Sequence, residues 1–214
     1  RQHYYRMNDT DARTMAMMLT TPDPKLGPLL TALKGAADRL GAPFRITETN
    51  SATSGGVAGV SDAYGSALWA LDNIFIMALG GASGVHFHGG DTAKYSPFNF
   101  GSEKVTTIKP LYYGLLFSKM VGQGNLLDAS INAGGQNISI YAIQTASDLA
   151  MVFVNKEVSQ SFEVNVQLPG SLMSLTAVYL RGPGLTSSTG IDIQGASISV
   201  SGGLGAMAAP LSLI

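Results

Sequence analysis

Cysteine is absent from the 214-residue chain, and charged residues make up only 13% of it. The absence of cysteine excludes a thiol nucleophile, a thiolate-bound metal and a disulfide framework. The net charge is −1, so the sequence offers no basic surface for nucleic acid or for an anionic membrane. We therefore expect neither of these as a partner.

Long apolar runs are also lacking. The longest, from Ala67 to Ala82, is interrupted by Asp72 and Asn73 and is too short to cross a bilayer. The sequence contains no recognisable export signal. Because the chain enters a strand-like run almost directly after Arg1, we expect further residues upstream.

Residues 1–122 alternate short apolar runs with helical patterns. In each predicted helix, apolar residues recur three or four positions apart. The predicted strands are Gln2–Arg6, Phe44–Thr47 and Val85–His88, and the predicted helices begin near Asp23, Ser61 and Pro110. Such alternation is typical of parallel βα units.

Residues 123–214 follow a different pattern. Apolar and polar residues alternate around positions 138–140, 162–168, 191–193 and 198–200, and Gly, Asn, Ser and Pro separate these runs. This pattern predicts an antiparallel β-sandwich. Three βα units cannot close a barrel, so residues 1–122 are either the last units of a (β/α)8 TIM barrel or pair with strands of another chain. The predicted fold class is thus α/β plus all-β, with a boundary at 122/123.

Glu48 is the strongest candidate for chemistry. It follows the predicted strand Phe44–Thr47 and precedes a loop rich in serine and glycine. In a (β/α)8 barrel, the carboxyl ends of the strands form the catalytic face. A carboxylate there can attack the anomeric carbon of a sugar. The plainer alternative is a solvated glutamate paired with Arg45.

Two histidines, His86 and His88, share one face of the third predicted strand, because alternate strand residues point the same way. Together with Asp91 they could bind a metal ion in a metal-dependent hydrolase. They could equally bind a sugar, orient a carboxylate or serve the packing of the strand.

Three tyrosines could contribute to the same site. Tyr4 and Tyr5 are adjacent on the first strand, so only one of them can face the mouth of a barrel. A phenol there could donate to a carboxylate and keep it ionised. Tyr95 follows the third strand by a short loop and could bind substrate. Ordinary aromatic packing is the alternative for all three.

Four stretches of the sequence resemble glycoside hydrolase family 79, which includes bacterial β-glucuronidases and mammalian heparanase. They are HYYR, RITETNSATSGGVAGVSDAYGSALWALD, VHFHGGDTAKYSPF and KPLYYGLLFSKMVG. The resemblance covers roughly residues 1–122, and the second half resembles the C-terminal domain of the family only in kind. It implies the last βα units of a TIM barrel followed by a β-sandwich.

The resemblance also implies roles for residues. Glu48 matches the nucleophile at the end of the seventh barrel strand, and Tyr4 matches a tyrosine that contacts this nucleophile. His88 matches a residue of the eighth strand that reaches the active site.

Further residues match the part of the site that contacts substrate. Tyr95 and the backbone N–H groups around Gly55 match the groups that hold the substrate carboxylate. Asn50 and Ser54 are additional candidates for substrate contact. One residue departs from the family, because Thr53 stands where a carboxylate-binding tyrosine is often found, and its hydroxyl reaches less far.

The leading expectation is therefore a retaining glycoside hydrolase that acts on β-linked glycans containing uronic acids. Its general acid/base would lie outside this chain, on an N-terminal chain or segment that completes the barrel. The resemblance implies no cofactor and no metal. A polymeric substrate favours a secreted or periplasmic protein. The alternatives are the metal-dependent hydrolase using His86 and His88, and a non-catalytic fragment that binds carbohydrate or supports structure.

Overall fold

A computed structural model describes residues 2–168, 170 and 173–213 of the chain. The first part contains three strands, β1 (Gln2–Met7), β2 (Phe44–Ala52) and β3 (Ala82–Phe87). They form a parallel sheet in the order β1-β2-β3, so the predicted βα arrangement is confirmed here. Within the described chain, no further strand pairs with β1 or β3, and the sheet has two open edges.

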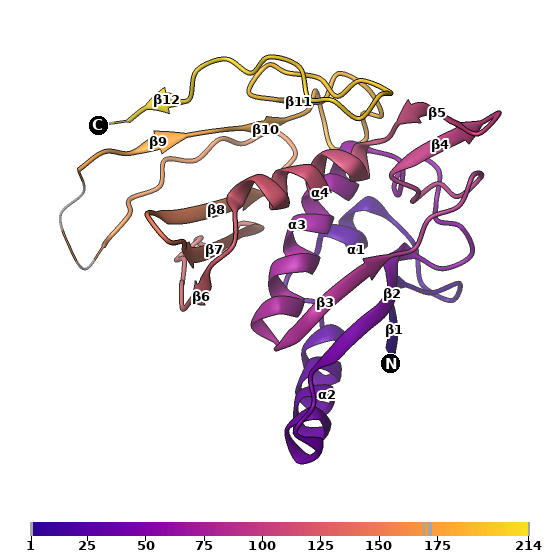
Figure 1. The fold of residues 1–214 in the computed structure, drawn as a ribbon, viewed down its shortest axis with the longest axis horizontal. Coiled ribbons are helices and arrows are strands. Elements are labelled where there is room, and N and C mark those ends of the chain that lie inside the picture. The colour runs from indigo at the N-terminus through magenta and orange to yellow at the C-terminus, as the bar shows by residue number, and fades with distance from the viewer. Residues whose placement is uncertain (1, 169, 171–172, 214) are drawn as a thin grey trace.

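The helices α1 (Met15–Leu19) and α2 (Leu26–Leu40) lie between β1 and β2 in the chain, and α3 (Tyr64–Leu79) lies between β2 and β3. The helix α4 (Pro110–Val121) comes after β3 and leads to the second half of the chain. The helix α2 ends where predicted, because Gly41 adopts a left-handed conformation with φ of 58° and its N–H bonds to the carbonyls of Ala37 and Asp38. In Figure 1, α2 lies toward the bottom of the sheet, and α3 lies between β3 and the C-terminal strands.

The helix α3 is buried on almost every side. Its Trp69 packs in one hydrophobic cluster with Met7 of β1 and with Tyr141 and Val152 from the second half of the chain. Asp72, which interrupts the longest apolar run of the sequence, is 4% exposed and forms an ion pair with the buried Lys156. A single apolar core thus extends across the predicted boundary at 122/123.

The second half is antiparallel, as predicted. Its largest sheet has the order β6-β7-β8, formed by Asn125–Leu127, Ile138–Gln144 and Leu149–Asn155. Shorter pairs join β9 (Thr176–Ala177) to β12 (Leu211–Ser212) and β10 (Leu180–Arg181) to β11 (Asp192–Ile193). A hairpin of β4 (Phe98–Gly101) and β5 (Lys104–Ile108) precedes α4.

Two predicted strands of the sandwich are wrong. Residues 162–168 are not part of any ladder, and residues 198–200 contribute only the single bridge between Ile198 and Leu204. Alternation alone does not make a strand, because a strand also needs a neighbour for its backbone groups and a surface to cover its apolar face. Val164 and Val166 lack such a cover, being 39% and 40% exposed.

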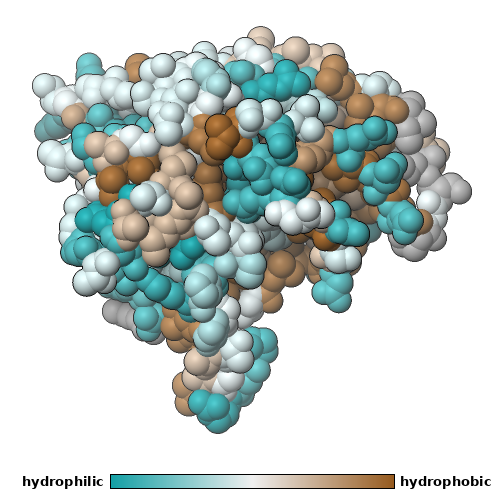
Figure 2. All heavy atoms as spheres, turned by 180° about the vertical axis from the view of Figure 1, so that it is seen from behind, coloured by the Kyte–Doolittle hydropathy of each residue, from teal (hydrophilic) through white to brown (hydrophobic). Residues whose placement is uncertain are grey.

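The surface is neither uniformly hydrophilic nor uniformly apolar (Figure 2). From behind, hydrophilic residues gather in separate groups with apolar residues between them (Figure 2). Among the described residues, no helix combines the length and the apolar character needed to cross a bilayer.

Candidate active site

Glu48 lies within β2 and not at its end, because the strand continues past it to Ala52. This corrects the predicted end of the strand at Thr47. Parallel pairing sets Glu48 opposite His3 of β1. The Glu48 side chain is 29% exposed, so solvent and ligands can reach its carboxylate.

The phenol that contacts Glu48 belongs to Tyr5 and not to Tyr4. The hydroxyl of Tyr5 donates to Oε1 of Glu48 at 2.7 Å. Tyr4 points to the opposite face of the sheet, where it is 7% exposed and its hydroxyl donates to Asp23. The alternation of side chains along a strand permits only one of two neighbours to face the site, and the prediction chose the wrong one.

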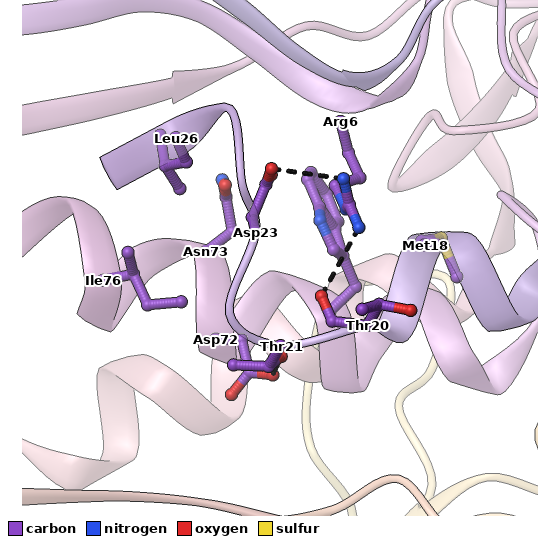
Figure 3. Close-up of a pocket in the computed structure, with 10 residues that line it drawn as sticks. Arg6, Met18, Thr20, Thr21, Asp23, Leu26, Asp72, Asn73 and Ile76 are labelled. Carbon is purple, nitrogen blue, oxygen red and sulfur yellow. Dashed lines mark hydrogen bonds and ion pairs between the residues drawn. The ribbon is translucent and has the colours of Figure 1, made fainter. Parts of the chain in front are cut away.

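Behind the sheet, Tyr4 belongs to a structural cluster. Arg6 bonds to Oδ1 of Asp23 at 3.2 Å and to the carbonyl of Thr20 at 3.4 Å (Figure 3). These residues line a cavity of about 20 Å³, which has room for roughly one water molecule. The cavity is too small for a sugar, so this polar cluster fixes β1 and does not bind substrate.

His88 lies at the centre of a hydrogen-bonded chain. It directly follows β3, and its backbone N–H donates to the carbonyl of Thr49 in β2. Its Nδ1 is 2.8 Å from the Tyr5 hydroxyl, 3.0 Å from the Tyr95 hydroxyl and 3.6 Å from Oε1 of Glu48. Because Tyr5 gives its one proton to Glu48, a bond between Tyr5 and His88 requires a proton on Nδ1. The structure thus brings together Glu48, His88 and Tyr95, as predicted.

Hydrogen bonding sets the charge of this group. The bond from Tyr5 is the main cause that lowers the pKa of Glu48; partial burial opposes it, and the nearby imidazoles of His3 and His88 add to it. Burial, together with the bonds to Glu48 and Tyr95, raises the pKa of Tyr5 well above its usual value. At neutral pH, Glu48 is therefore an anion and Tyr5 a neutral donor.

His3 is a site residue that the sequence prediction missed. Its Nδ1 lies 3.5 Å from Oε2 of Glu48, on the opposite side from His88. His3 and Tyr5 are two positions apart on β1, a spacing that directs both side chains to one face. This spacing was the available indication in the sequence.

Asn50 supports the site from inside the protein and is not placed to touch a substrate, which corrects the prediction. It is 0% exposed, and its amide donates to the carbonyls of His88 at 2.7 Å and Tyr95 at 3.2 Å. Its Oδ1 accepts the backbone N–H of Ser51 at 2.8 Å. The amide thereby ties β2 to the segment that carries His88 and Tyr95.

The glycine-bearing loop follows β2. Gly55 lies at its tip with φ of 80°, and its carbonyl accepts the N–H of Lys94 at 2.6 Å. The hydroxyl of Ser54 donates to Asp9 at 2.8 Å, so this side chain is bonded within the protein. Thr53 also donates to Asp9, at 3.0 Å. The loop is therefore bonded both to the turn after β1 and to the segment before Tyr95.

The alternative interpretation, a metal site of His86, His88 and Asp91, has no assembled ligand set among the described residues. Nε2 of His86 accepts a bond from Nε of Arg45 at 3.2 Å, whereas His88 bonds to the two tyrosines. Across the described residues, no three histidine or carboxylate side chains, Asp91 included, gather closely enough to hold a metal ion. His86 and His88 thus form hydrogen bonds with different residues and do not converge on one point.

Comparison with known proteins agrees with the resemblance of the motifs. No protein-family model matches the chain. A β-glucuronidase of Aspergillus niger is 30% identical over 110 residues, which is 50% of this chain and 18% of that protein. The predicted relationship to β-glucuronidases is thereby confirmed.

A solved structure is similar over almost the whole chain. It is a 4-O-α-L-rhamnosyl-β-D-glucuronidase from Fusarium oxysporum 12S in complex with Rha-GlcA, with a TM-score of 0.72 and 21% identity. The match covers 98% of this chain and 47% of the other, so both halves of the chain share the fold of part of that enzyme. The chain spans less than half the length of either relative.

Proposed function

We propose that this chain carries the nucleophile of a retaining glycoside hydrolase that acts on β-linked uronic acids, and that the nucleophile is Glu48. The observation that carries the proposal is the bond from Tyr5 to Oε1 of Glu48 at 2.7 Å beside an open face of the sheet. This bond orients the carboxylate and keeps it ionised, which are the two requirements for attack on an anomeric carbon.

In the proposed reaction, Oε2 or Oε1 of Glu48 attacks the anomeric carbon while the bond to the leaving group breaks. A carboxylic acid protonates the leaving oxygen, and water then hydrolyses the glycosyl-enzyme with that group as the base. The two attacks together retain the configuration of the sugar. The phenol of Tyr5 holds the carboxylate before attack and after release.

The general acid/base is proposed to lie outside these 214 residues. Among the described residues, no second carboxylate bonds to Glu48, Tyr5 or His88. In retaining enzymes the two carboxyl groups are about 5–5.5 Å apart, so the partner must stand close to Glu48. The greater length of both relatives supports a donor elsewhere in a longer protein.

The same missing part is proposed to complete a (β/α)8 barrel, with residues 1–122 as its last βα units and 123–214 as an attached sandwich. The open edges of β1 and β3 support this, because unpaired backbone groups need partners. An apolar groove of about 390 Å³ lies between α3 and β3, lined by residues that include Ile74, Val85 and Phe87. A further strand on β3 would cover it.

The substrate class follows from the groups around Glu48. Tyr95 is 4% exposed overall, but its hydroxyl lies 3.0 Å from Nδ1 of His88, whose side chain is 47% exposed. The loop of Gly55 is bonded to the segment that holds Tyr95. A phenol and backbone N–H groups can bind the carboxylate of a uronic acid without a mobile cation. Export to the periplasm or the medium is proposed as the setting, because structural glycans that contain uronic acids occur outside the cytoplasm.

The test compares turnover of an aryl β-glucuronide by the full-length protein containing these residues and by its Glu48→Gln variant. We expect a loss of about 1000-fold or more, because glutamine cannot form the glycosyl-enzyme. Glu163→Gln, a change at an exposed glutamate of the second half, is the matched control and should retain full activity. Equal turnover by both Glu48 forms, or a product of inverted configuration, would contradict the proposal.

A further inference from the structure

The loop after β2 is bonded to an ion pair, Asp9 and Arg13, that takes no part in the proposed chemistry. Nη1 of Arg13 bonds to Oδ1 of Asp9 at 3.0 Å, and Nη2 bonds to the carbonyl of Thr53 at 2.8 Å. Asp9 in turn accepts the hydroxyls of Thr53 and Ser54, one on each oxygen. Two residues from the turn after β1 thus fix two consecutive residues of the loop.

The backbone that they hold is unusual. Ser54, Gly55 and Gly56 have φ values of 55°, 80° and 86° in succession. Glycine adopts this region freely, but a serine there is uncommon and needs compensation, which the bond to Asp9 supplies. At Gly56 a Cβ atom would lie 2.9 Å from Ser61 and 3.0 Å from the backbone nitrogen of Tyr95. The loop therefore packs tightly against the segment that carries Tyr95.

This conformation leaves two donors available. The N–H of Gly56 bonds to the carbonyl of Thr53, and that of Thr53 bonds to Met7. Within the part of the chain that the structure describes, the backbone N–H groups of Ser54 and Gly55 bond to no acceptor. They are two adjacent donors in a turn beyond the strand that carries Glu48, and neighbouring N–H groups of this kind bind anions.

The charge of Asp9 does not oppose an anion at this place. Both oxygens of its carboxylate accept bonds, because Arg13 and the hydroxyls of Thr53 and Ser54 donate to them. These donors lower its pKa, the bonds from Ser54 and Thr53 being the largest causes. The pair of Asp9 and Arg13 is thus neutral overall. The electrostatic potential at the turn is therefore set mainly by the backbone N–H groups.

We propose that Asp9 and Arg13 are positioning residues that set the preference of the site for uronic acids over neutral sugars. They hold the Ser54–Gly56 turn so that the free N–H groups of Ser54 and Gly55 meet the sugar carboxylate. This inference rests on the proposed function and adds a determinant of specificity to it. It also accounts for Thr53, whose hydroxyl orders the loop instead of reaching the substrate.

The test measures kcat and KM of the full-length protein and its Asp9→Ala variant with an aryl β-glucuronide and the matching aryl β-glucoside. We expect KM for the glucuronide to rise about tenfold or more, the equivalent of losing one charge-assisted contact, with kcat changed less than about threefold. The ratio of kcat/KM for glucuronide to glucoside should fall with it. Asp9→Asn keeps one acceptor oxygen and should give an intermediate KM.

Asp38→Asn is the matched control, because it removes an exposed ion pair with Lys34 on α2, and it should leave both substrates unaffected. An unchanged KM in Asp9→Ala, or equal losses with both substrates, overturns the inference. If Asp9→Ala does not fold, Asp9→Asn decides by the same criterion. Should Glu48→Gln abolish turnover while the Asp9 variants keep their KM, this inference fails and the proposed function stands. Activity retained in Glu48→Gln rejects the proposed function itself.

Discussion

Asp72 and Glu48 are two carboxylates of one chain in opposite surroundings. Asp72 is 4% exposed and binds the buried ammonium of Lys156, the hydroxyl of Tyr141 at 2.9 Å and that of Thr21 at 3.2 Å. Glu48 faces an open sheet surface, and its partners are a phenol and two imidazoles. The ammonium beside Asp72 balances its charge, whereas the partners of Glu48 orient the carboxylate and leave its side chain 29% exposed.

Asp72 is a structural carboxylate, and Glu48 is the proposed nucleophile. The Asp72 cluster joins α3 to the strands of the second half, since Tyr141 lies in β7 and Lys156 directly follows β8. It stabilises the packing of the two halves. The Glu48 group joins β1, β2 and the segment after β3, at the place where the sheet meets solvent. Substitutions should therefore affect stability at one cluster and turnover at the other.

The largest expected effect on stability is that of Lys156→Met. The change leaves the buried carboxylate of Asp72 without its cation, which costs about 3–5 kcal/mol of the free energy of unfolding. Urea denaturation measures the loss. Lys34→Met, which breaks the exposed pair with Asp38, is the control and should cost no more than about 0.5 kcal/mol. Equal stability of the two variants would contradict a larger contribution of the buried pair than of the exposed pair.

Asn50→Ala should follow, with a loss of about 2 kcal/mol, because the buried carbonyls of His88 and Tyr95 would lose their donor. The same denaturation experiment applies. We expect turnover to fall as well, since these two residues would be held less firmly. Unchanged stability together with a rise in KM alone would show instead that Asn50 contacts the substrate.

The smallest effect is expected for Tyr5→Phe, with kcat/KM reduced about tenfold, near 1.4 kcal/mol. The bond from Tyr5 stabilises the ionised form of Glu48, so its removal raises the pKa of Glu48. The acid limb of the profile of kcat/KM against pH should therefore move to higher pH. Tyr4→Phe removes a hydroxyl on the other face and should leave this limb in place. A shift in Tyr4→Phe alone would reverse the assignment of the two tyrosines.

Much of the first half could be predicted from its sequence. Apolar periodicity located β1, β2 and β3 and the helices α2, α3 and α4, because each of these elements carries its own repeat. The short helix α1 was not predicted. The same reasoning failed at residues 162–168, where alternation was present but no neighbouring strand pairs with the segment. Pairing depends on distant parts of the chain, which local periodicity does not encode.

The site could be predicted in outline. The sequence predicted Glu48, His88 and Tyr95 for one site, and the structure places their side chains close together. The resemblance pointed to Tyr4, whereas Tyr5 contacts Glu48. The pairing of β1 with β2 shifts between Gln2 and His3, which no count along the sequence reveals. The contacts of Asp9 and Arg13 with the loop were missed because their partner Thr53 lies about 40 residues away in the sequence.

Trapping the glycosyl-enzyme tests the central claim most directly. A 2-deoxy-2-fluoro β-glucuronide with a good leaving group, incubated with the full-length protein, should form a stable ester, because the fluorine slows hydrolysis of the intermediate. Peptide mass mapping should then find the added mass on the peptide that carries Glu48, and fragmentation should assign it to that residue. An adduct on another carboxylate, or complete inactivation with Glu48 unmodified, would contradict the account.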